Sequence, residues 1–166
     1  LSPRGGGEGL WKLQGDIGTE LWNAANGPVA AAPAISPDGT RVAFPIRQQG
    51  RAMLHVMNAN GTGVQRLAES LDVRGAVSWS PDGRWIALAA NGESGPRVFK
   101  VPVDGQAPVQ LVDSLSLNPV WSPDGEFIVY GGPDVGGVFP LKAITPNGQA
   151  YPLPDLTLRR GAERFC

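Results

Sequence analysis

Three aspartates at nearly equal spacing are the first residues in this sequence that could do chemistry. Asp38, Asp82 and Asp124 lie 44 and 42 residues apart. Carboxylates that are brought together can act as general acid and base, so the three could form a ring of acidic groups. Each aspartate, however, stands in a Ser-Pro-Asp-Gly tetrapeptide, where the turn itself favours Asp. We therefore interpret them as turn residues on separate structural units, too far apart for acid–base catalysis.

The chain offers few other reactive side chains. His55 is the single histidine and falls within an expected strand, and Cys166 is the single cysteine. A zinc or manganese site needs several histidine or cysteine ligands, which these two residues cannot supply. Residues 92–96 come close to a nucleophile elbow, but Pro96 stands where the last glycine should be. The sequence therefore predicts a protein that is not an enzyme and that has no cofactor or metal.

The composition is typical of a turn-rich β protein. The 166 residues include 23 Gly and 16 Pro, together about twice the usual share. Five Trp, five Phe and two Tyr can fill a core, which argues against disorder. With 14 basic and 15 acidic residues the net charge is −1, so we expect no nucleic-acid partner. No apolar run approaches the roughly 18–20 residues of a membrane span, so we expect no direct membrane insertion.

A repeat of a little over 40 residues organises the chain. The Ser-Pro-Asp-Gly turns are each preceded by an apolar residue and followed by an alternating apolar strand. A second glycine turn comes 22 or 23 residues after the first, and then a leucine closes each copy. The second turns are Asn60-Gly61, Asp104-Gly105 and Asn147-Gly148. Each copy reads as four short antiparallel strands, which is the unit of a β-propeller blade.

We therefore predict an all-β fold, a β-propeller with about four blades' worth of four-stranded antiparallel meanders. The alternating second-strand residues should fill the spaces between blades, and Trp79 and Trp121 should pack between first strands near the axis. The predicted divisions are a partial blade of third and fourth strands at 1–29, whole blades at 30–70, 71–113 and 114–156, and the first strand of a further blade at 157–166.

Two segments carry a family resemblance. They are 77–87, Val-Ser-Trp-Ser-Pro-Asp-Gly-Arg-Trp-Ile-Ala, and 54–61, Leu-His-Val-Met-Asn-Ala-Asn-Gly. Both resemble the repeats of the TolB-like, WD-repeat-like β-propeller family, which also occur in the propellers of prolyl-oligopeptidase-type peptidases. The resemblance implies that the chain is a fragment of a larger propeller of about six to eight blades. It also implies a bacterial periplasmic or other extracytoplasmic location.

The segments that connect the strands differ among the copies, and such segments carry recognition in many folds. Links from fourth to first strands are expected at 69–75, 113–117 and 155–161. Links from second to third strands are expected at 45–51, 90–96 and 131–137, at the same end of the propeller. The candidate partner-binding residues in these links are Arg47, Arg51, Asp72, Arg74, Glu93, Asp134, Arg159 and Arg160.

The expected function is a non-catalytic scaffold that binds a protein or peptide. One alternative is the gating propeller of a prolyl-oligopeptidase-type serine peptidase whose hydrolase domain lies outside this segment. Another is the sensor domain of a bacterial kinase or transcriptional regulator. We expect the open faces of the end blades to be covered by the remaining blades of a parent protein or by self-association.

Overall fold

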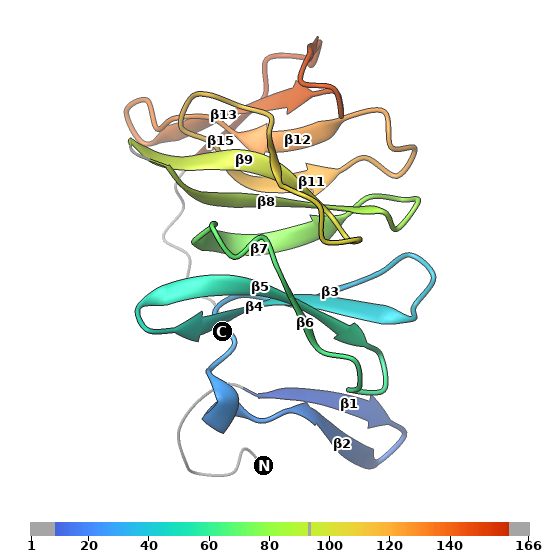
Figure 1. Ribbon diagram of the computed structural model, residues 1–166. Coiled ribbons are helices and arrows are strands. Elements are labelled where there is room, and N and C mark those ends of the chain that lie inside the picture. Colours follow the sequence, from blue (N-terminus) through green and yellow to red (C-terminus); the bar gives the residue numbers. More distant parts are fainter. Residues whose placement is uncertain (1–8, 93, 160–166) are drawn as a thin grey trace.

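The computed structural model describes residues 9–92 and 94–159 as four antiparallel β-sheets that follow one another in chain order (Figure 1). The first is a hairpin of β1 (Leu10–Gln14) and β2 (Ile17–Trp22), followed by a 3-10 helix at Ala24–Asn26. Each later sheet is a meander in which consecutive strands are neighbours. The prediction of an all-β chain built from such meanders is confirmed.

The three meanders are called blades 1 to 3. Blade 1 contains β3 (Ala34–Ile35), β4 (Arg41–Gln48), β5 (Arg51–Asn58) and β6 (Gln65–Leu67). Blade 2 contains β7 (Val73–Trp79), β8 (Trp85–Gly92), β9 (Gly95–Pro102) and β10 (Val109–Gln110). Blade 3 contains β11 (Leu117–Trp121), β12 (Ile128–Gly131), β13 (Val138–Ile144) and β14 (Ala150–Tyr151), with β15 (Thr157–Arg159) beside β13.

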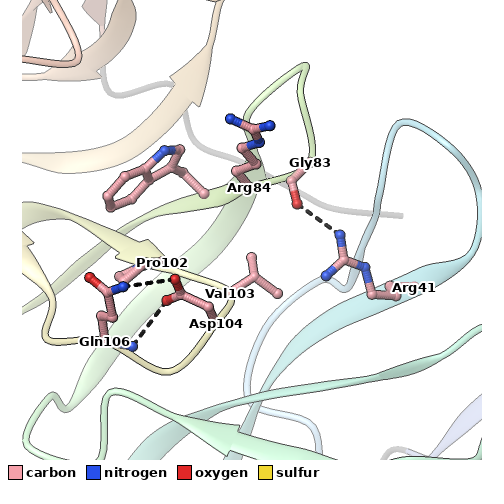
Figure 2. A pocket seen from close by; sticks show the side chains of 8 residues that line it. Arg41, Gly83, Arg84, Pro102, Val103, Asp104 and Gln106 are labelled. Carbon is pink, nitrogen blue, oxygen red and sulfur yellow. Dashed lines mark hydrogen bonds between the residues drawn. The ribbon is translucent and has the colours of Figure 1, made fainter.

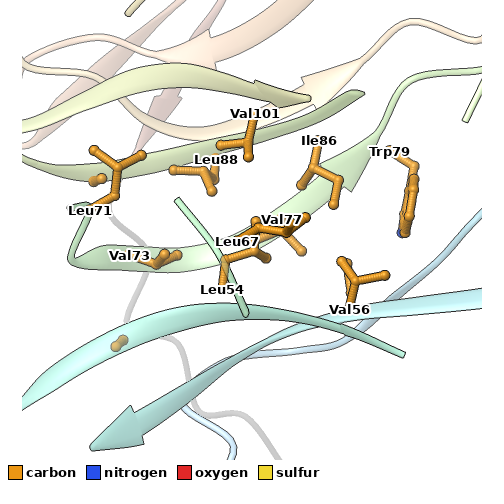
Figure 3. Close-up of a cluster of buried hydrophobic side chains, with 13 residues drawn as sticks. Leu54, Val56, Leu67, Leu71, Val73, Val77, Trp79, Ile86, Leu88 and Val101 are labelled. Carbon is orange, nitrogen blue, oxygen red and sulfur yellow. The ribbon is translucent and has the colours of Figure 1, made fainter. Parts of the chain in front are cut away.

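The packing between blades 1 and 2 follows the alternation of the second strands. Ile86 and Leu88 of β8 are fully buried and belong to the same cluster as Leu54 and Val56 of β5 (Figure 3). Ala87 points to the other side of the sheet and joins the cluster between blades 2 and 3. Blade 2 is therefore apolar on both faces, because blades 1 and 3 cover them.

The same arrangement recurs at the other two interfaces. Ile128 and Tyr130 of β12 pack toward blade 2, and Phe44 of β4 packs toward the β1–β2 hairpin, where Leu21 and Trp22 cover it. Trp79 and Trp121 end the first strands of blades 2 and 3 and are both buried. The Trp79 Nε1–H donates to the Ala34 carbonyl of the preceding first strand at 2.9 Å. The predicted place of Trp79 between first strands is thus confirmed.

Two of the predicted second-to-third links are shorter than expected. β4 runs to Gln48 and β5 starts at Arg51, so Gln49-Gly50 alone forms the turn. Both residues have positive φ, 49° and 80°, as the two-residue type I′ hairpin requires. In blade 2, β8 likewise extends to Gly92 and β9 starts at Gly95. Strand pairing continues into these segments because it satisfies their backbone hydrogen-bonding groups.

The end of the described chain adds an outer strand to blade 3, because Thr157–Arg159 pairs with Val138–Pro140. That residues 157–166 start a further blade stays a prediction. β14 covers only Ala143 and Ile144 of β13, so the first half of β13 has an open edge that the following link fills. Residues 160–166 lie outside the described residues.

Candidate functional site

The three Ser-Pro-Asp-Gly aspartates act as turn latches. In the first turn, the Ser36 hydroxyl donates to Asp38 Oδ1 at 2.6 Å, and the Thr40 N–H donates to the same oxygen at 3.0 Å. Ser36 Oγ in turn accepts the Arg41 N–H, and Gly39 adopts φ 71°. The turns at Ser80 and Ser122 repeat these contacts. The structure therefore agrees with the structural interpretation of the aspartates.

These hydrogen bonds set the ionisation of the aspartates. The Ser36 hydroxyl and the Thr40 N–H and hydroxyl lower the pKa of Asp38 from 3.8 to about 2. In Asp124, the Ser122 hydroxyl and the Glu126 N–H lower the pKa in the same way. A carboxylate that holds its charge this firmly is a poor proton donor near neutral pH. The end of the strands that carries these turns, which we call the turn face, therefore presents carboxylates that stay charged near neutral pH.

His55 lies inside the interface between blade 1 and the β1–β2 hairpin. Its ring is 6% exposed and lies 6.0 Å from the Trp22 ring and 6.1 Å from the Phe44 ring, centroid to centroid. Its Nδ1 lies 2.9 Å from the Met53 carbonyl oxygen. Burial lowers the pKa of His55. The histidine thus belongs to the core, as a strand residue with a neutral ring.

The structure brings three of the eight predicted partner-binding residues to one hollow. Arg47, on β4, lies across from Asp72 and Arg74, which stand at the start of blade 2. The hollow has a volume of about 90 Å³. Small residues complete its wall: Ala30, Ala31, Pro45, Ala52, Val73 and Gly75. This cavity is called the loop-face hollow.

Arg47 and Arg74 differ in the contacts that they make at the loop-face hollow. Arg47 is exposed, and its guanidinium makes no hydrogen bond within the part of the chain that the structure describes. The Arg74 Nε–H donates to Asn91 Oδ1 at 3.0 Å, and a terminal nitrogen lies 4.0 Å from Asp72 Oδ2. Arg74 is therefore held from one side, with N–H groups left for a ligand.

Asp72 has a role that the sequence did not reveal. Its Oδ1 accepts the Ala52 N–H of β5 at 2.8 Å, and its Oδ2 accepts an Asn91 Nδ2–H of β8 at 2.6 Å. One carboxylate thereby links the third strand of blade 1 to the second strand of blade 2. Such charge-assisted hydrogen bonds are about twice as strong as neutral ones. Asp72 is a clamp between the two blades that also lines the hollow.

The remaining predicted residues lie elsewhere. Arg51 is near the loop-face hollow but donates to the carbonyls of Glu69 and Ser70. Asp134 lies in the β12–β13 loop of blade 3, where its Oδ1 accepts the Gly137 N–H. Arg159 ends β15 and is exposed. Glu93 and Arg160 lie outside the described residues.

A second cavity, which the sequence analysis missed, lies at the opposite end of the strands (Figure 2). It has a volume of about 600 Å³, and we call it the turn-face pocket. Arg41 spans it from blade 1: its guanidinium lies 4.9 Å from the Trp79 ring centroid and donates to the Gly83 carbonyl at 2.8 Å. The signals in the sequence were Arg41, the second residue after the first turn, and Arg84, the first residue after the second turn. The lining residues are Arg41, Gly83, Arg84, Trp85, Pro102, Val103, Asp104 and Gln106.

Among residues 9–92 and 94–159, no group of three or more histidine, cysteine, aspartate or glutamate side chains could hold a metal ion. None of the helices in that part of the chain is long and apolar enough to cross a membrane.

Comparison with known proteins gives one family. A family model for the TolB beta propeller domain matches residues 18–147. The chain is 30% identical over 127 residues to the "Protein TolB homolog" of Chlorobium luteolum, which covers 75% of this chain and 29% of that protein. It is 34% identical over 109 residues to "Tricorn protease homolog 1" of Streptomyces coelicolor, which covers 63% of this chain and 9% of that protein. The chain thus spans less than a third of the length of either curated relative.

The solved structures agree on the fold. The putative TolB from Agrobacterium tumefaciens superposes with a TM-score of 0.63 at 18% identity, over 79% of this chain and 46% of that chain. An identity this low shows the fold alone. The prediction of a β-propeller segment of TolB type is therefore confirmed.

Proposed function

This chain belongs to the TolB beta propeller domain family, and from that premise we propose that it is a non-catalytic scaffold that binds a protein or peptide on the face of the loop-face hollow. The observation that carries the proposal is the convergence of Arg47, Asp72 and Arg74 from two blades on one hollow. Polar groups that converge on a concave surface are typical of a binding site. An extracytoplasmic location, implied by the family, is part of the proposal.

The proposal is tested by comparing two faces of the same molecule. The triple variant Arg47→Glu, Arg51→Glu, Arg74→Glu reverses charge on the loop face, and Arg84→Glu reverses charge on the turn face. Each immobilised protein is incubated with a bacterial periplasmic extract, and each captured protein is purified and titrated calorimetrically. We expect at least one partner that binds the unmodified chain and Arg84→Glu equally well and the triple variant much more weakly. If every captured partner binds the triple variant as tightly as the unmodified chain, the proposal is contradicted.

A second function is favoured by the likeness to the tricorn protease homolog. In that case the propeller would admit peptides to a hydrolase domain encoded beside it. The discriminating observation is the adjacent coding sequence, where a Gly-x-Ser-x-Gly motif after a strand would identify a serine hydrolase. Loss of peptide hydrolysis by the whole enzyme when the propeller is removed, with unchanged hydrolysis of a small ester, would support gating.

Apolar side chains at both ends of the stack support a further part of the proposal. Trp11 and Leu13, two residues apart on β1, are 53% and 77% exposed, and Val120 on β11 is 57% exposed. Side chains at the corresponding faces inside the stack are covered by the next blade. We propose that the remaining blades of a parent protein, or another copy of this chain, cover these end faces.

A further inference from the structure

We propose that the loop-face hollow binds a carboxylate group of a peptide between the guanidinium groups of Arg47 and Arg74. The inference rests on the proposed function, because it names the chemical group that the scaffold recognises. A C-terminal carboxylate and an acidic side chain present the same group, and the experiment below separates them.

The charge of the hollow favours an anion. Two guanidinium groups and one carboxylate line it, so its lining is positive, although the whole chain has a net charge of −1. The single negative group, Asp72, already accepts hydrogen bonds at both oxygens from Ala52 and Asn91. Asp72 therefore holds Arg74 from one side, and among the described residues no acidic side chain forms an ion pair with Arg47. A planar guanidinium pairs best with a carboxylate through two parallel hydrogen bonds.

The size of the hollow favours a small group. Its volume of about 90 Å³ equals that of roughly three water molecules at about 30 Å³ each. A carboxylate with its first methylene group has about this size. Ala30, Ala31 and Ala52 also line the hollow, and their short side chains leave room for a methylene group beside the carboxylate.

The repeat provides an internal comparison. A shift of 44 residues, which carries Gly39 to Gly83, carries Arg47 to Asn91. Arg74 pairs with Ala89 of β8, and the residue in the same register of blade 3 is Leu117, which pairs with Gly131 of β12. The interface of blades 2 and 3 therefore has no arginine at either position. The second interface has a different contact in place of the Asp72 clamp, because the Ser116 hydroxyl accepts the Val98 N–H of β9 at 3.0 Å, whereas the residue that corresponds to Ala52 is Pro96. The fold thus forms this interface without an arginine at either position, which points to a ligand for Arg47 and Arg74.

The comparison also supplies the test variants. Arg47→Asn installs the residue of the second interface, Arg74→Asn removes the other positive charge, and Arg84→Asn makes the same change of charge on the turn face as a control. The probes are four acetylated pentapeptides of Gly and Ser that differ at the central residue or the C-terminus. They carry a central glutamate with an amidated end, a central glutamine with an amidated end, a central glutamine with a free carboxylate, and a central phosphoserine with an amidated end. Binding to the 166-residue chain is followed by NMR at the arginine Nε–H signals, up to millimolar peptide.

We expect the glutamate peptide, the free-carboxylate peptide or both to shift the Arg47 and Arg74 signals saturably, and the amidated glutamine peptide to leave them unchanged. Whichever peptide binds identifies the source of the carboxylate. Arg47→Asn should weaken binding about tenfold, since hydrogen bonds to charged groups contribute at least about that much. Arg84→Asn should not change it, and thermal unfolding of each variant checks the fold.

Three results overturn the inference: no saturable shift with either carboxylate peptide, equal binding to Arg47→Asn, or tighter binding of the phosphoserine peptide than of both carboxylates. These results are separable from a failure of the proposed function. If a partner no longer binds the triple glutamate variant but still binds Arg47→Asn and Arg74→Asn, the scaffold role stands and only the carboxylate inference fails. If the triple glutamate variant keeps every partner, both the proposed function and the carboxylate inference fail.

Discussion

The two repeated tryptophans should respond differently to the same conservative change. Trp79 and Trp121 occupy equivalent positions and are 7% and 8% exposed. Trp79 donates its indole N–H to the Ala34 carbonyl and lies beneath the Arg41 guanidinium. The Trp121 Nε1 is buried, and no described residue accepts its hydrogen. Removing the indole N–H therefore loses a hydrogen bond at Trp79, whereas at Trp121 it removes a buried donor that has no acceptor among the described residues.

The magnitudes follow from these contacts. Trp→Ala at either site should lower the free energy of unfolding by about 3–5 kcal/mol, as for other buried aromatic side chains. Trp79→Phe loses a hydrogen bond worth about 1 kcal/mol and part of a cation–π contact worth about 0.5–1 kcal/mol. Trp121→Phe loses the same volume, but burying its unpaired donor had cost about 1–3 kcal/mol. Trp79→Phe should therefore be more destabilising by about 2–5 kcal/mol.

The assay is urea unfolding followed by far-UV circular dichroism, which does not depend on indole fluorescence. The two Phe variants are compared with each other and with the corresponding Ala variants at equal protein concentration. A Trp121→Phe variant that is as unstable as Trp79→Phe would refute the assignment of the indole contacts. A Trp79→Ala cost below about 1 kcal/mol would refute the buried placement itself.

Four other outcomes are expected. In an NMR titration, Ser36→Ala should raise the pKa of Asp38 from about 2 toward 3.8. Because the folded pKa is lowered, the stability from this turn is present above pH 3.8 and is lost as the pH falls through about 2. The substitution should therefore reduce the loss of stability between pH 3.8 and about 2. Burial lowers the pKa of His55, so its neutral form supports the fold above the ordinary pKa of 6.5; unfolding measured from pH 8 to 5 should show stability falling below pH 6.5, and His55→Phe should remove that slope. Asp72→Ala should destabilise the chain by about 2–3 kcal/mol by calorimetry, whereas Asp72→Asn should cost less, since its amide oxygen can still accept the Ala52 N–H; equal costs would contradict the clamp. In size-exclusion chromatography, the isolated chain should elute larger than a monomer because Trp11, Leu13 and Val120 are exposed, and a sharp monomer peak would contradict association through the end faces.

The sequence predicted those features that each blade specifies locally. The Ser-Pro-Asp-Gly turns are defined by contacts between residues at most five apart, as between Ser36 Oγ and the Arg41 N–H, so their pattern is visible in the chain itself. The two-residue turn at Gln49-Gly50 was not predicted, because glutamine rarely adopts positive φ and gives no turn signal.

Contacts between blades were harder to predict. The Asp72 clamp joins residues 20 and 19 positions away on two different sheets, so no local pattern reveals it. Arg47 and Arg74 were chosen as charged residues in expected links, but their convergence depends on how two sheets stack. The pairing of Thr157–Arg159 was missed because it depends on the shortness of β14, which sequence alternation does not indicate.

The latch of each turn is confined to its own blade, whereas the long basic side chains reach across to the next one. Arg41 bonds the Gly83 carbonyl of blade 2, and Lys100 bonds the Pro146 carbonyl of blade 3 at 2.7 Å. A gene duplication could therefore insert a new blade without altering any turn, because every copy brings its own serine and aspartate. Both acceptors are backbone carbonyls at turns that recur in every blade, so an inserted blade would offer the same acceptors to the arginine or lysine of its neighbour.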